Sequence, residues 1–306
     1  MKAIRIHEYG DVKKLKLEEV PRLAIDEDQL LIRVRDAGVN PIDWKIREGH
    51  MKKWMSSKFP LTIGQDFAGE VVEFGQRLEA FHRGQRVFGF GLGTYAEYAV
   101  APASTVAEMP ESMSFEVAAA LPTAGSTALQ LVRGALGAQP GMSVLIHGAA
   151  GGVGSFATQI AQDRGAYIIA TATGPLDIAY LQSLGVDQII DFRRERFEDQ
   201  VHEVDAVVDL AGGETLARSF GVIKKGGVLA STVGPIEERA AKQVGIRAVH
   251  VLMQRNAADL IELAHQVVKG VLKPRMGKSL PLNEARQAQE MSQKGQAGGK
   301  LILKVA

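Results

Sequence analysis

Cysteine is missing from all 306 residues of the chain. Its absence excludes disulfides, thiolate metal sites, iron–sulfur clusters and cysteine nucleophiles. An excess of charge of one sign is missing too, because 36 Lys and Arg face 35 Asp and Glu, which leaves a formal net charge of +1. A balance this close gives no general attraction to nucleic acid or to an anionic membrane. We therefore expect neither as a partner.

The chain also lacks a segment typical of a membrane span or a secretory signal. The longest stretch without charged residues, 134–162, exceeds the ~20 residues that cross a bilayer, but glycines and Pro140 interrupt it. The N-terminal MKAIRIHEYGD has no apolar core of a signal peptide. The cytoplasm is the expected location. With 46% hydrophobic and 23% charged residues, the composition is that of a globular protein, and the length fits two domains.

The first third of the chain is typical of β-structure. Ile32 and Val34 alternate with Arg33 and Arg35, which is the period of a half-buried strand. Three further short segments, FAGEVVEFG, QRVFGFG and YAEYAVAP, follow between glycine-containing turns. Many short strands with such turns predict a small, closed or partly open barrel.

Beyond Pro140 the pattern becomes a regular alternation. The apolar segments MSVLIH, AYIIATA, DAVVDLAG and GVLAST are separated by helical segments such as 153–164. Buried strands that alternate with helices predict a doubly wound α/β fold with a parallel sheet. Before it, an Ala- and Leu-rich segment predicts helices interrupted at Pro122 and Gly125. After it, we expect a strand over 246–253, a helix ending near Gly270, and a terminal strand KLILKV that returns to the β unit.

A glycine-rich loop, HGAAGGVG at 147–154, lies between a buried strand and a helix. This is the context of a dinucleotide-binding fingerprint, although Ala149 stands at the first glycine position. Gly151 lets the backbone approach a pyrophosphate, and Gly154 permits close packing of helix on strand. The alternative is a tight turn that binds nothing, and the strands and helices that follow favour the cofactor. The predicted pyrophosphate contacts are Ala150, Gly151, Gly152 and Val153.

The end of the second strand of this unit indicates which cofactor. NAD sites carry a carboxylate about 20 residues after the loop, and residues 170–174 read ATATG. Without that carboxylate, a 2′-phosphate is not repelled. The hydroxyls of Thr171 and Thr173 and the guanidinium of Arg193 or Arg194 are candidate partners for it. The sequence therefore favours NADPH, although the arginines at 193–196 are also consistent with a solvated turn.

Several segments together carry a family resemblance. They are, in order, MKAIRIHEYG, AGVNPIDWKIREG, FPLTIGQDFAGEVVEFG, GTYAEYAV, LPTAGSTAL, HGAAGGVG, DLAGG and GGKLILKV. The chain resembles the medium-chain dehydrogenase/reductase superfamily, and within it the zinc-independent, ζ-crystallin-like NADPH:quinone oxidoreductase branch. The resemblance implies a GroES-like catalytic domain at 1–120, a Rossmann domain at 121–265, and a segment at 266–306 that returns to the first. It also implies a cofactor between the domains and a homodimer joined near 249–253.

The resemblance also bears on whether the chain binds zinc. Zinc alcohol dehydrogenases of the superfamily hold their metal with cysteine, a His-Glu pair and a second cysteine. Asn40, the pair Gln65–Asp66 and Thr123 stand at or near those positions here. Zinc prefers thiolate and imidazole ligands, and the seven histidines show no paired metal spacing. We expect no metal.

Further site residues follow from the resemblance alone. Asn40 and Asp43 in NPID and Thr127 in GSTAL are the expected catalytic group, beside the nicotinamide. Without the resemblance, Asn40 reads as a turn residue and Thr127 as an ordinary helix residue. Trp44 and Gln65 are the expected substrate contacts. The remaining expected cofactor contacts are Leu210, Ala211, Gly212, Gly234, Gly299 and Lys300.

The missing acid–base machinery also limits the chemistry. Alcohol oxidation needs a metal or a tuned base to lower the pKa of the hydroxyl. Hydride addition to a quinone or a conjugated enone needs less, because the oxyanion is delocalised and a few hydrogen-bond donors suffice. We therefore expect an NADPH-dependent quinone or enone reductase. The alternative is an NADPH-binding protein with little turnover.

Overall fold

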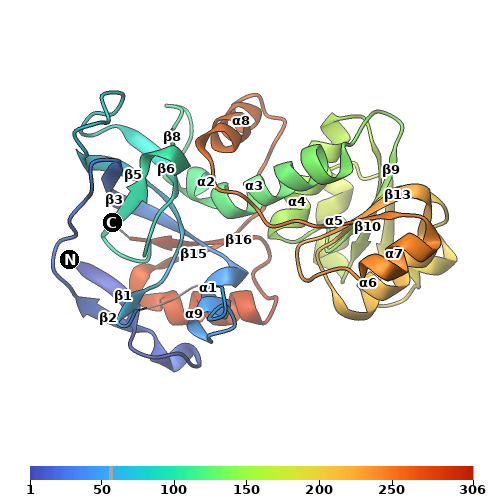
Figure 1. Ribbon diagram of the computed structural model, residues 1–306, viewed down its shortest axis with the longest axis horizontal. Coiled ribbons are helices and arrows are strands. Elements are labelled where there is room, and N and C mark those ends of the chain that lie inside the picture. Colours follow the sequence, from blue (N-terminus) through green and yellow to red (C-terminus); the bar gives the residue numbers. More distant parts are fainter. Residues whose placement is uncertain (55–57, 306) are drawn as a thin grey trace. The chain divides into compact units, whose positions relative to one another are not determined.

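The computed structural model describes residues 1–54 and 58–305, and the chain forms two compact units (Figure 1). The first unit comprises Met1–Ser126, Arg255–Gly270 and Pro274–Ala306. The second comprises Thr127–Gln254 and Val271–Lys273. Each contains its own sheet and its own apolar core.

The first unit is built on a seven-stranded sheet with the order β15-β16-β3-β5-β6-β8, in which β7 also pairs with β3. Ile32 and Val34 of the long strand β3 are fully buried while Arg33 and Arg35 are half-buried, which confirms the predicted alternation. A separate three-stranded sheet has the order β2-β1-β4. The strands are β1 (Lys2–Ile6), β2 (Lys16–Glu19), β3 (Gln29–Val39), β4 (Leu61–Thr62), β5 (Asp66–Phe74), β6 (Arg86–Phe90), β7 (Tyr98–Pro102), β8 (Val106–Glu108), β15 (Met276–Pro281) and β16 (Lys300–Lys304).

The last strand of the chain completes this sheet. β16 lies antiparallel to β3, with Leu301 opposite Val39 and Leu303 opposite Ala37. The prediction that KLILKV returns to the N-terminal β unit is therefore confirmed. The pairing also carries Lys300 to the end of β3, next to the turn that starts at Asn40.

Helices of the first unit connect these strands. The predicted break at Pro122 is confirmed, because α2 ends at Ala120 and α3 begins at Pro122. The predicted interruption at Gly125 is wrong. Gly125 lies inside α3, where a Cβ would come within 2.8 Å of Leu263 of α8, so its small size serves helix packing. The elements are α1 (Pro41–Arg47), α2 (Phe115–Ala120), α3 (Pro122–Leu129), α8 (Ala257–Val268), α9 (Ala285–Gln293) and the 3₁₀ turns Val12–Lys14, Ala103–Thr105 and Leu282–Glu284.

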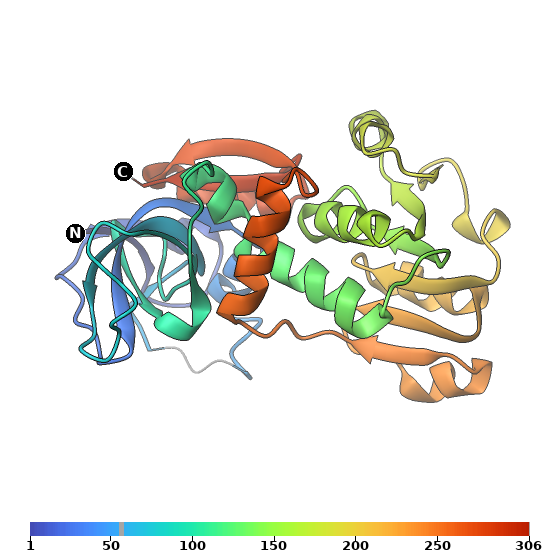
Figure 2. The same cartoon turned by 90° about the horizontal axis from the view of Figure 1, so that it is seen from above.

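The second unit is a doubly wound parallel sheet with the strand order β11-β10-β9-β12-β13-β14. Numbered from its first strand, this is the order 3-2-1-4-5-6 of a Rossmann fold. Figure 2 shows helices on both faces of the sheet. The strands are β9 (Ser143–His147), β10 (Tyr167–Ala172), β11 (Gln188–Asp191), β12 (Val204–Asp209), β13 (Ile223–Ser231) and β14 (Arg247–His250). The helices are η3 (Gln130–Leu136, a π-helix), α4 (Gly152–Asp163), α5 (Pro175–Ser183), α6 (Gly213–Ser219), α7 (Glu238–Val244) and the 3₁₀ turns Phe197–Asp199 and Phe220–Val222.

The residue limits of the two compact units differ from the domain limits expected from the sequence. Helix α8 groups with the first unit, whereas the expected Rossmann domain extended to residue 265. The contacts of α8 give the reason. Leu263 packs on Gly125, and α8 contacts β8 of the seven-stranded sheet. The strand expected at 246–253 is shorter, because β14 ends at His250.

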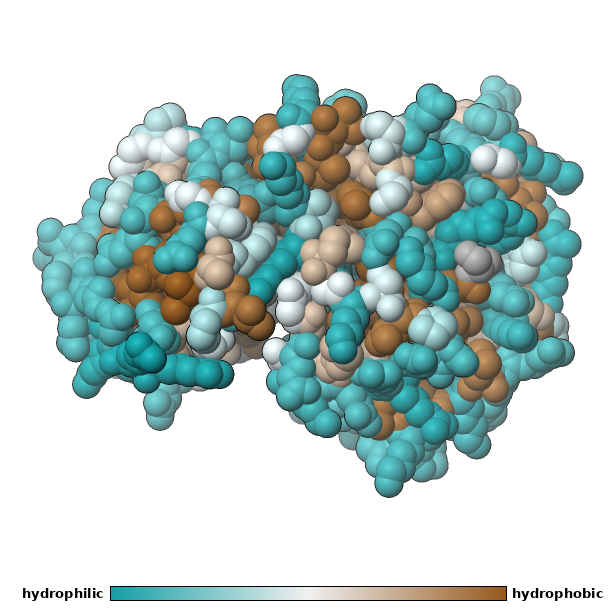
Figure 3. Space-filling model, turned by 180° about the vertical axis from the view of Figure 1, so that it is seen from behind, coloured by the Kyte–Doolittle hydropathy of each residue, from teal (hydrophilic) through white to brown (hydrophobic). Residues whose placement is uncertain are grey.

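The surface that Figure 3 displays is largely hydrophilic, with apolar side chains in separate patches. Among the residues that the structure describes, no helix combines the length and the apolar character that crossing a bilayer requires.

Candidate active site

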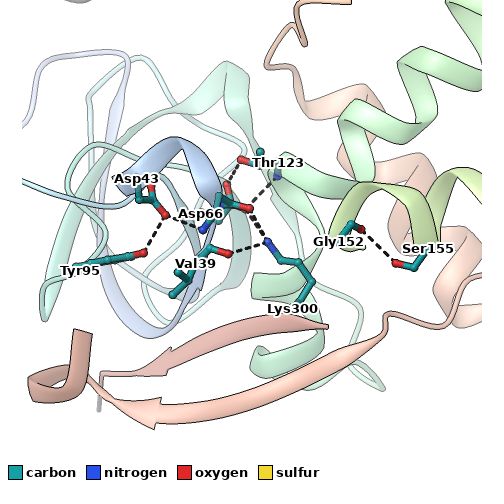
Figure 4. A network of polar contacts seen from close by, with 9 residues as sticks. Val39, Asp43, Asp66, Tyr95, Thr123, Gly152, Ser155 and Lys300 are labelled. Atoms are coloured by element: carbon teal, nitrogen blue, oxygen red, sulfur yellow. Dashed lines mark hydrogen bonds and ion pairs between the residues drawn. The ribbon is translucent and has the colours of Figure 1, made fainter. Parts of the chain in front are cut away.

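A buried polar network lies where three strands of the first unit meet (Figure 4). Asn40 follows the last residue of β3, Asp66 begins β5, and Lys300 begins β16. The register of the sheet sets Gly38 opposite Asp66 and Leu301 opposite Val39, so these strand ends are neighbours. The three side chains are 2%, 0% and 4% exposed, so every polar atom among them needs a partner.

The contacts within the network are short and complementary. Lys300 Nζ donates to Asn40 Oδ1 at 2.5 Å and lies 3.9 Å from Asp66 Oδ2. Asn40 Nδ2 donates to the same Asp66 Oδ2 at 2.8 Å. Burial lowers the pKa of Lys300, while the nearby carboxylates of Asp66 and Asp43 raise it. The ammonium and the carboxylate therefore offset part of each other's desolvation cost.

Thr123 closes the other side of Asp66. Its backbone N–H donates to Asp66 Oδ2 at 3.1 Å and its hydroxyl donates to Oδ1 at 2.5 Å. The resemblance sets Asn40, Asp66 and Thr123 at or near the zinc-ligand positions of alcohol dehydrogenases. In the structure, Asp66 bonds to the other two and lies near the Lys300 ammonium. An amide, a hydroxyl and one carboxylate are a poor donor set for zinc. Among the described residues, no group of three or more His, Asp or Glu is placed to hold a metal.

Asp43 is a second buried carboxylate, on the first turn of α1. Its Oδ2 accepts from the Asn40 backbone N–H at 2.7 Å and from the Tyr95 hydroxyl at 2.8 Å, while its buried Oδ1 has no partner in the described part of the chain. Burial raises the pKa of Asp43 to about 7. Burial and the Asp43 carboxylate also raise the pKa of Tyr95 well above 10, so the phenol stays a donor.

This shifted carboxyl predicts how stability depends on pH. Its pKa is 3.8 in a model peptide and about 7 in the folded chain, so between these values the folded chain binds the proton more tightly than the unfolded chain. The protonated Asp43 carboxyl therefore contributes to the free energy of unfolding at low pH, and this contribution is lost as pH rises. In Asp43→Asn the amide oxygen can still accept both hydrogen bonds, but nothing titrates. From about pH 5.5 to 7.5, the wild type should lose about 2 kcal/mol relative to this variant.

Urea unfolding of both proteins at several pH values measures that difference. His147 has the opposite effect, since burial lowers its pKa to about 4, but it is common to both proteins and cancels. Parallel stability curves would show that Asp43 does not titrate in this range.

The two expected substrate contacts lie beside this network in the chain. Trp44 is half-buried with its ring 5.9 Å from that of His50, and no residue that the structure describes accepts from its buried Nε1–H. The Gln65 Oε1 accepts from Arg255, whose guanidinium lies over Phe90 at 5.5 Å. Sequence reasoning missed Tyr95 and Arg255. Tyr95 lies in GTYAEYAV, one of the segments of the resemblance, but no sequence signal connects Arg255 with Gln65.

The second unit holds the glycine loop. Gly151 is the N-cap of α4, with φ −74° and its N–H on Gly148 O at 2.9 Å. A Cβ on Gly151 would have one neighbour within 4 Å, Gly148 O at 3.2 Å, whereas a Cβ on Gly154 would lie 2.1 Å from the same oxygen. The absence of a side chain at Gly154 therefore permits close packing of the helix on the loop. At Gly151 it leaves open space at the N-terminus of α4. Ala150, Gly152 and Val153 complete the turn, and the Ser155 hydroxyl donates to Gly152 O at 3.2 Å (Figure 4).

The end of β10 carries the residues expected at the ribose. Arg193 reaches it from the loop after β11, with its Nη1 3.7 Å from the position of a Cβ on Gly174. Thr173 donates to Asp177 at 3.1 Å and is exposed. The Thr171 hydroxyl is buried and lies 3.3 Å from His147 Nδ1, and His147 Nε2 contacts Ser219 at 3.1 Å. Thr173 and Arg193 are therefore the members of this group that solvent reaches.

The other expected cofactor residues follow neighbouring strands. Leu210, Ala211 and Gly212 come after β12, where the N–H groups of Ala211 and Gly212 donate to Asp209 at 3.2 and 2.9 Å. Gly234 follows β13, and a Cβ there would have no atom of the described residues within 4 Å. Because these turns follow the carboxyl ends of parallel strands, they lie along one edge of the sheet, which is where open α/β sheets bind ligands.

Three further residues expected at the nicotinamide cofactor lie away from these turns. Thr127, on α3, is buried and begins the second unit. Gly299 has φ +149°, and a Cβ there would come within 2.4 Å of Arg275 O, so only glycine fits. Lys300 was expected at the cofactor, and the structure directs its ammonium into the network with Asn40 and Asp66.

A Rossmann sheet and a GroES-like barrel in one chain define a dehydrogenase or reductase of two units. The model of the alcohol dehydrogenase GroES-like domain matches residues 26–111, and that of the zinc-binding dehydrogenases matches residues 184–303. The quinone oxidoreductase of Mus musculus is 31% identical over 99% of this chain and 97% of its own length. The 2-methylene-furan-3-one reductase of Solanum lycopersicum is 34% identical over 99% of this chain and 79% of its own length.

Solved structures agree with these sequence relatives. The quinone oxidoreductase of Coxiella burnetii superposes with a TM-score of 0.93 at 36% identity, covering 100% of this chain and 99% of that one. The Escherichia coli quinone oxidoreductase complexed with NADPH gives 0.92 at 26% identity, covering 100% of both chains. The chain belongs to the quinone oxidoreductase branch of the medium-chain dehydrogenase/reductase superfamily. It is an oxidoreductase that uses a nicotinamide cofactor and acts on a small molecule.

Proposed function

We propose that the chain is a zinc-independent, NADPH-dependent reductase of quinones and α,β-unsaturated carbonyl compounds. The observation that carries the proposal is the buried network of Asn40, Asp66 and Lys300, which offers fixed donors and no metal ligand set. The relatives named above supply the substrate class, since one is a quinone oxidoreductase and another a furanone reductase.

The reduced nicotinamide supplies a hydride, which brings two electrons to the acceptor. The acceptor oxygen then carries negative charge until it takes up one proton. Asn40 contributes an amide N–H and Trp44 an indole N–H that has no partner among the described residues. We propose that these donors bind the acceptor oxygen as its charge develops, which is the kind of stabilisation that oxyanion sites provide. Hydride transfer forms no bond between the acceptor and the protein, so no covalent step is needed.

A survey of acceptors with deuterium at C4 of NADPH tests the function. We expect oxidation of NADPH by 1,2- and 1,4-quinones or by simple enones, with deuterium transferred directly to an enone product. Efficient oxidation of a secondary alcohol with no quinone or enone reduced would overturn the proposal. Tight binding of NADPH without any turnover would favour a binding protein instead.

We also expect a preference for NADPH over NADH of order tenfold, about 1.4 kcal/mol. The support is Arg193 beside Gly174 at the end of β10, with no carboxylate in residues 170–174. Arg193→Ala should weaken NADPH several-fold and leave NADH unchanged. Arg194→Ala is the matched control, because Arg194 is 84% exposed and pairs with Asp191 at 3.6 Å. Thr173→Asp should abolish or reverse the preference.

Fluorescence titration of both coenzymes against each variant measures these affinities. Equal affinity of the wild type for NADH and NADPH, or an equal response of the two arginine variants, would contradict the prediction.

The assembly is proposed to be a homodimer joined at β14. This strand ends the order of the Rossmann sheet, and an uncovered strand edge is a template for pairing. Leu252, just beyond the strand, is 69% exposed. Sedimentation velocity tests the proposal, which a monomer at micromolar concentration would rule out.

A further inference from the structure

The ammonium of Lys300 is buried inside the first unit. It is 4% exposed, and its Nζ contacts Asn40 Oδ1 at 2.5 Å, Val39 O at 3.4 Å and the Asp66 carboxylate at 3.9 Å. An ammonium in such a place is costly unless it has a specific partner. Its main-chain and carboxylate partners are part of the sheet, which leaves the Asn40 amide as the group that it can orient.

The Asn40 amide is held at both ends. Its oxygen accepts from the Lys300 ammonium, and its nitrogen donates to the Asp66 carboxylate at 2.8 Å. Turning the amide by 180° would set N–H groups against the ammonium and the oxygen against the carboxylate. Both contacts would then be repulsive, so the ion pair selects one orientation.

One donor of that amide is left over. An amide nitrogen has two N–H groups, and Asp66 takes one of them. Within the described residues, no acceptor of the chain is placed for the other. Its direction is therefore fixed by Lys300 and Asp66 together rather than by Asn40 alone.

We propose that Lys300 is a positioning residue for the reduction, which with Asp66 fixes the Asn40 amide so that its second N–H faces the acceptor oxygen. This inference rests on the proposed function for its kinetic consequence. It differs from the cofactor contact that the family resemblance implies for Lys300, and from a role of the ion pair in stability alone.

A double-mutant cycle separates these roles. Lys300→Met removes charge and donor, and Lys300→Gln keeps an N–H that can reach the amide oxygen. We expect Lys300→Met to lower kcat for a quinone about tenfold, with Lys300→Gln in between and the dissociation constant of NADPH within threefold of the wild type. In an Asn40→Ala background, Lys300→Met should lower kcat no further, because effects that act through one group are not additive.

Lys304→Met is the matched control. Lys304 lies on the same strand and also forms ion pairs, with Asp36 at 3.0 Å and Glu116 at 3.3 Å, but it is 45% exposed. It should lower kcat less than twofold. Equal loss from Lys300→Met in both backgrounds would overturn the proposal in favour of a structural role. A parallel rise in the NADPH dissociation constant would overturn it in favour of a cofactor contact.

A crystal structure of Lys300→Met tests the inference without activity. We expect the Asn40 side chain to leave its contact with Asp66 or to occupy more than one orientation. A single unchanged orientation would refute the positioning role. If the wild type reduces no acceptor, the proposed function fails, and this structure still decides whether Lys300 orients Asn40.

Discussion

Substituting valine for Gly151 is expected to lower the affinity for NADPH at least about 100-fold, or about 2.7 kcal/mol. Gly151 caps a helix of 12 residues, whose N-terminal N–H groups and dipole favour a pyrophosphate. A Cβ at this position would meet one atom of the described chain within 4 Å, so it would face open space, which is where we propose that the pyrophosphate binds. With φ −74°, the backbone conformation suits a side chain, and Gly148 O, 3.2 Å from the Cβ position, needs to move by only a few tenths of an ångström. The variant should therefore stay folded.

Isothermal titration with NADPH and thermal unfolding without it measure the two effects. Gly221→Val is the matched control, because a Cβ at Gly221 would have no described atom within 4 Å and its φ is not positive. Gly154→Ala should show the opposite pattern to Gly151→Val. It should lower the melting temperature of the free chain, since its Cβ would lie 2.1 Å from Gly148 O. Wild-type affinity in Gly151→Val would show that the loop does not hold the pyrophosphate.

The second large effect is expected at Asn40. Asn40→Ala should lower kcat/KM for a quinone about 10- to 100-fold, or about 1.4–2.7 kcal/mol. The reason is the loss of an oriented N–H donor next to the proposed position of the acceptor oxygen. The loss should be smaller than total inactivation, because Asn40 is neither the acid nor the base of the reaction and Trp44 keeps its own donor.

Steady-state kinetics with NADPH and a 1,4-quinone measure this effect. Urea unfolding must accompany them, because the variant leaves buried atoms of Lys300 and Asp66 with one partner fewer and should lose about 1–3 kcal/mol of stability. Asn283→Ala, at an exposed position of the turn Leu282–Glu284, is the control for loss of an asparagine. A folded Asn40→Ala protein with wild-type kcat/KM would exclude the residue from the reaction.

The elements of the fold could be read from the sequence because their signals are local. The alternation around Ile32 and Val34 encodes a half-buried strand, and HGAAGGVG encodes a strand, a turn and a helix within eight residues. The alternation of apolar strands with helices then allows few topologies, and the Rossmann order follows. Gly125 shows the limit, since a glycine in a helical segment reads as a break until its close neighbour Leu263 is known.

The motifs also marked most positions of the candidate site, but not what their side chains contact. Lys300 and Asn40 are 260 residues apart, Arg255 and Gln65 are 190 apart, and Tyr95 and Asp43 are 52 apart. Such pairs form only when strand register and helix packing bring distant segments together, and no periodicity in the chain encodes them. The sequence by itself determined the two kinds of sheet and the glycine loop. Only the tertiary structure decided that the Lys300 ammonium turns toward Asn40 and Asp66. The reason is that a buried charge is stable only beside a counter-charge and hydrogen-bond partners, and these come from distant segments.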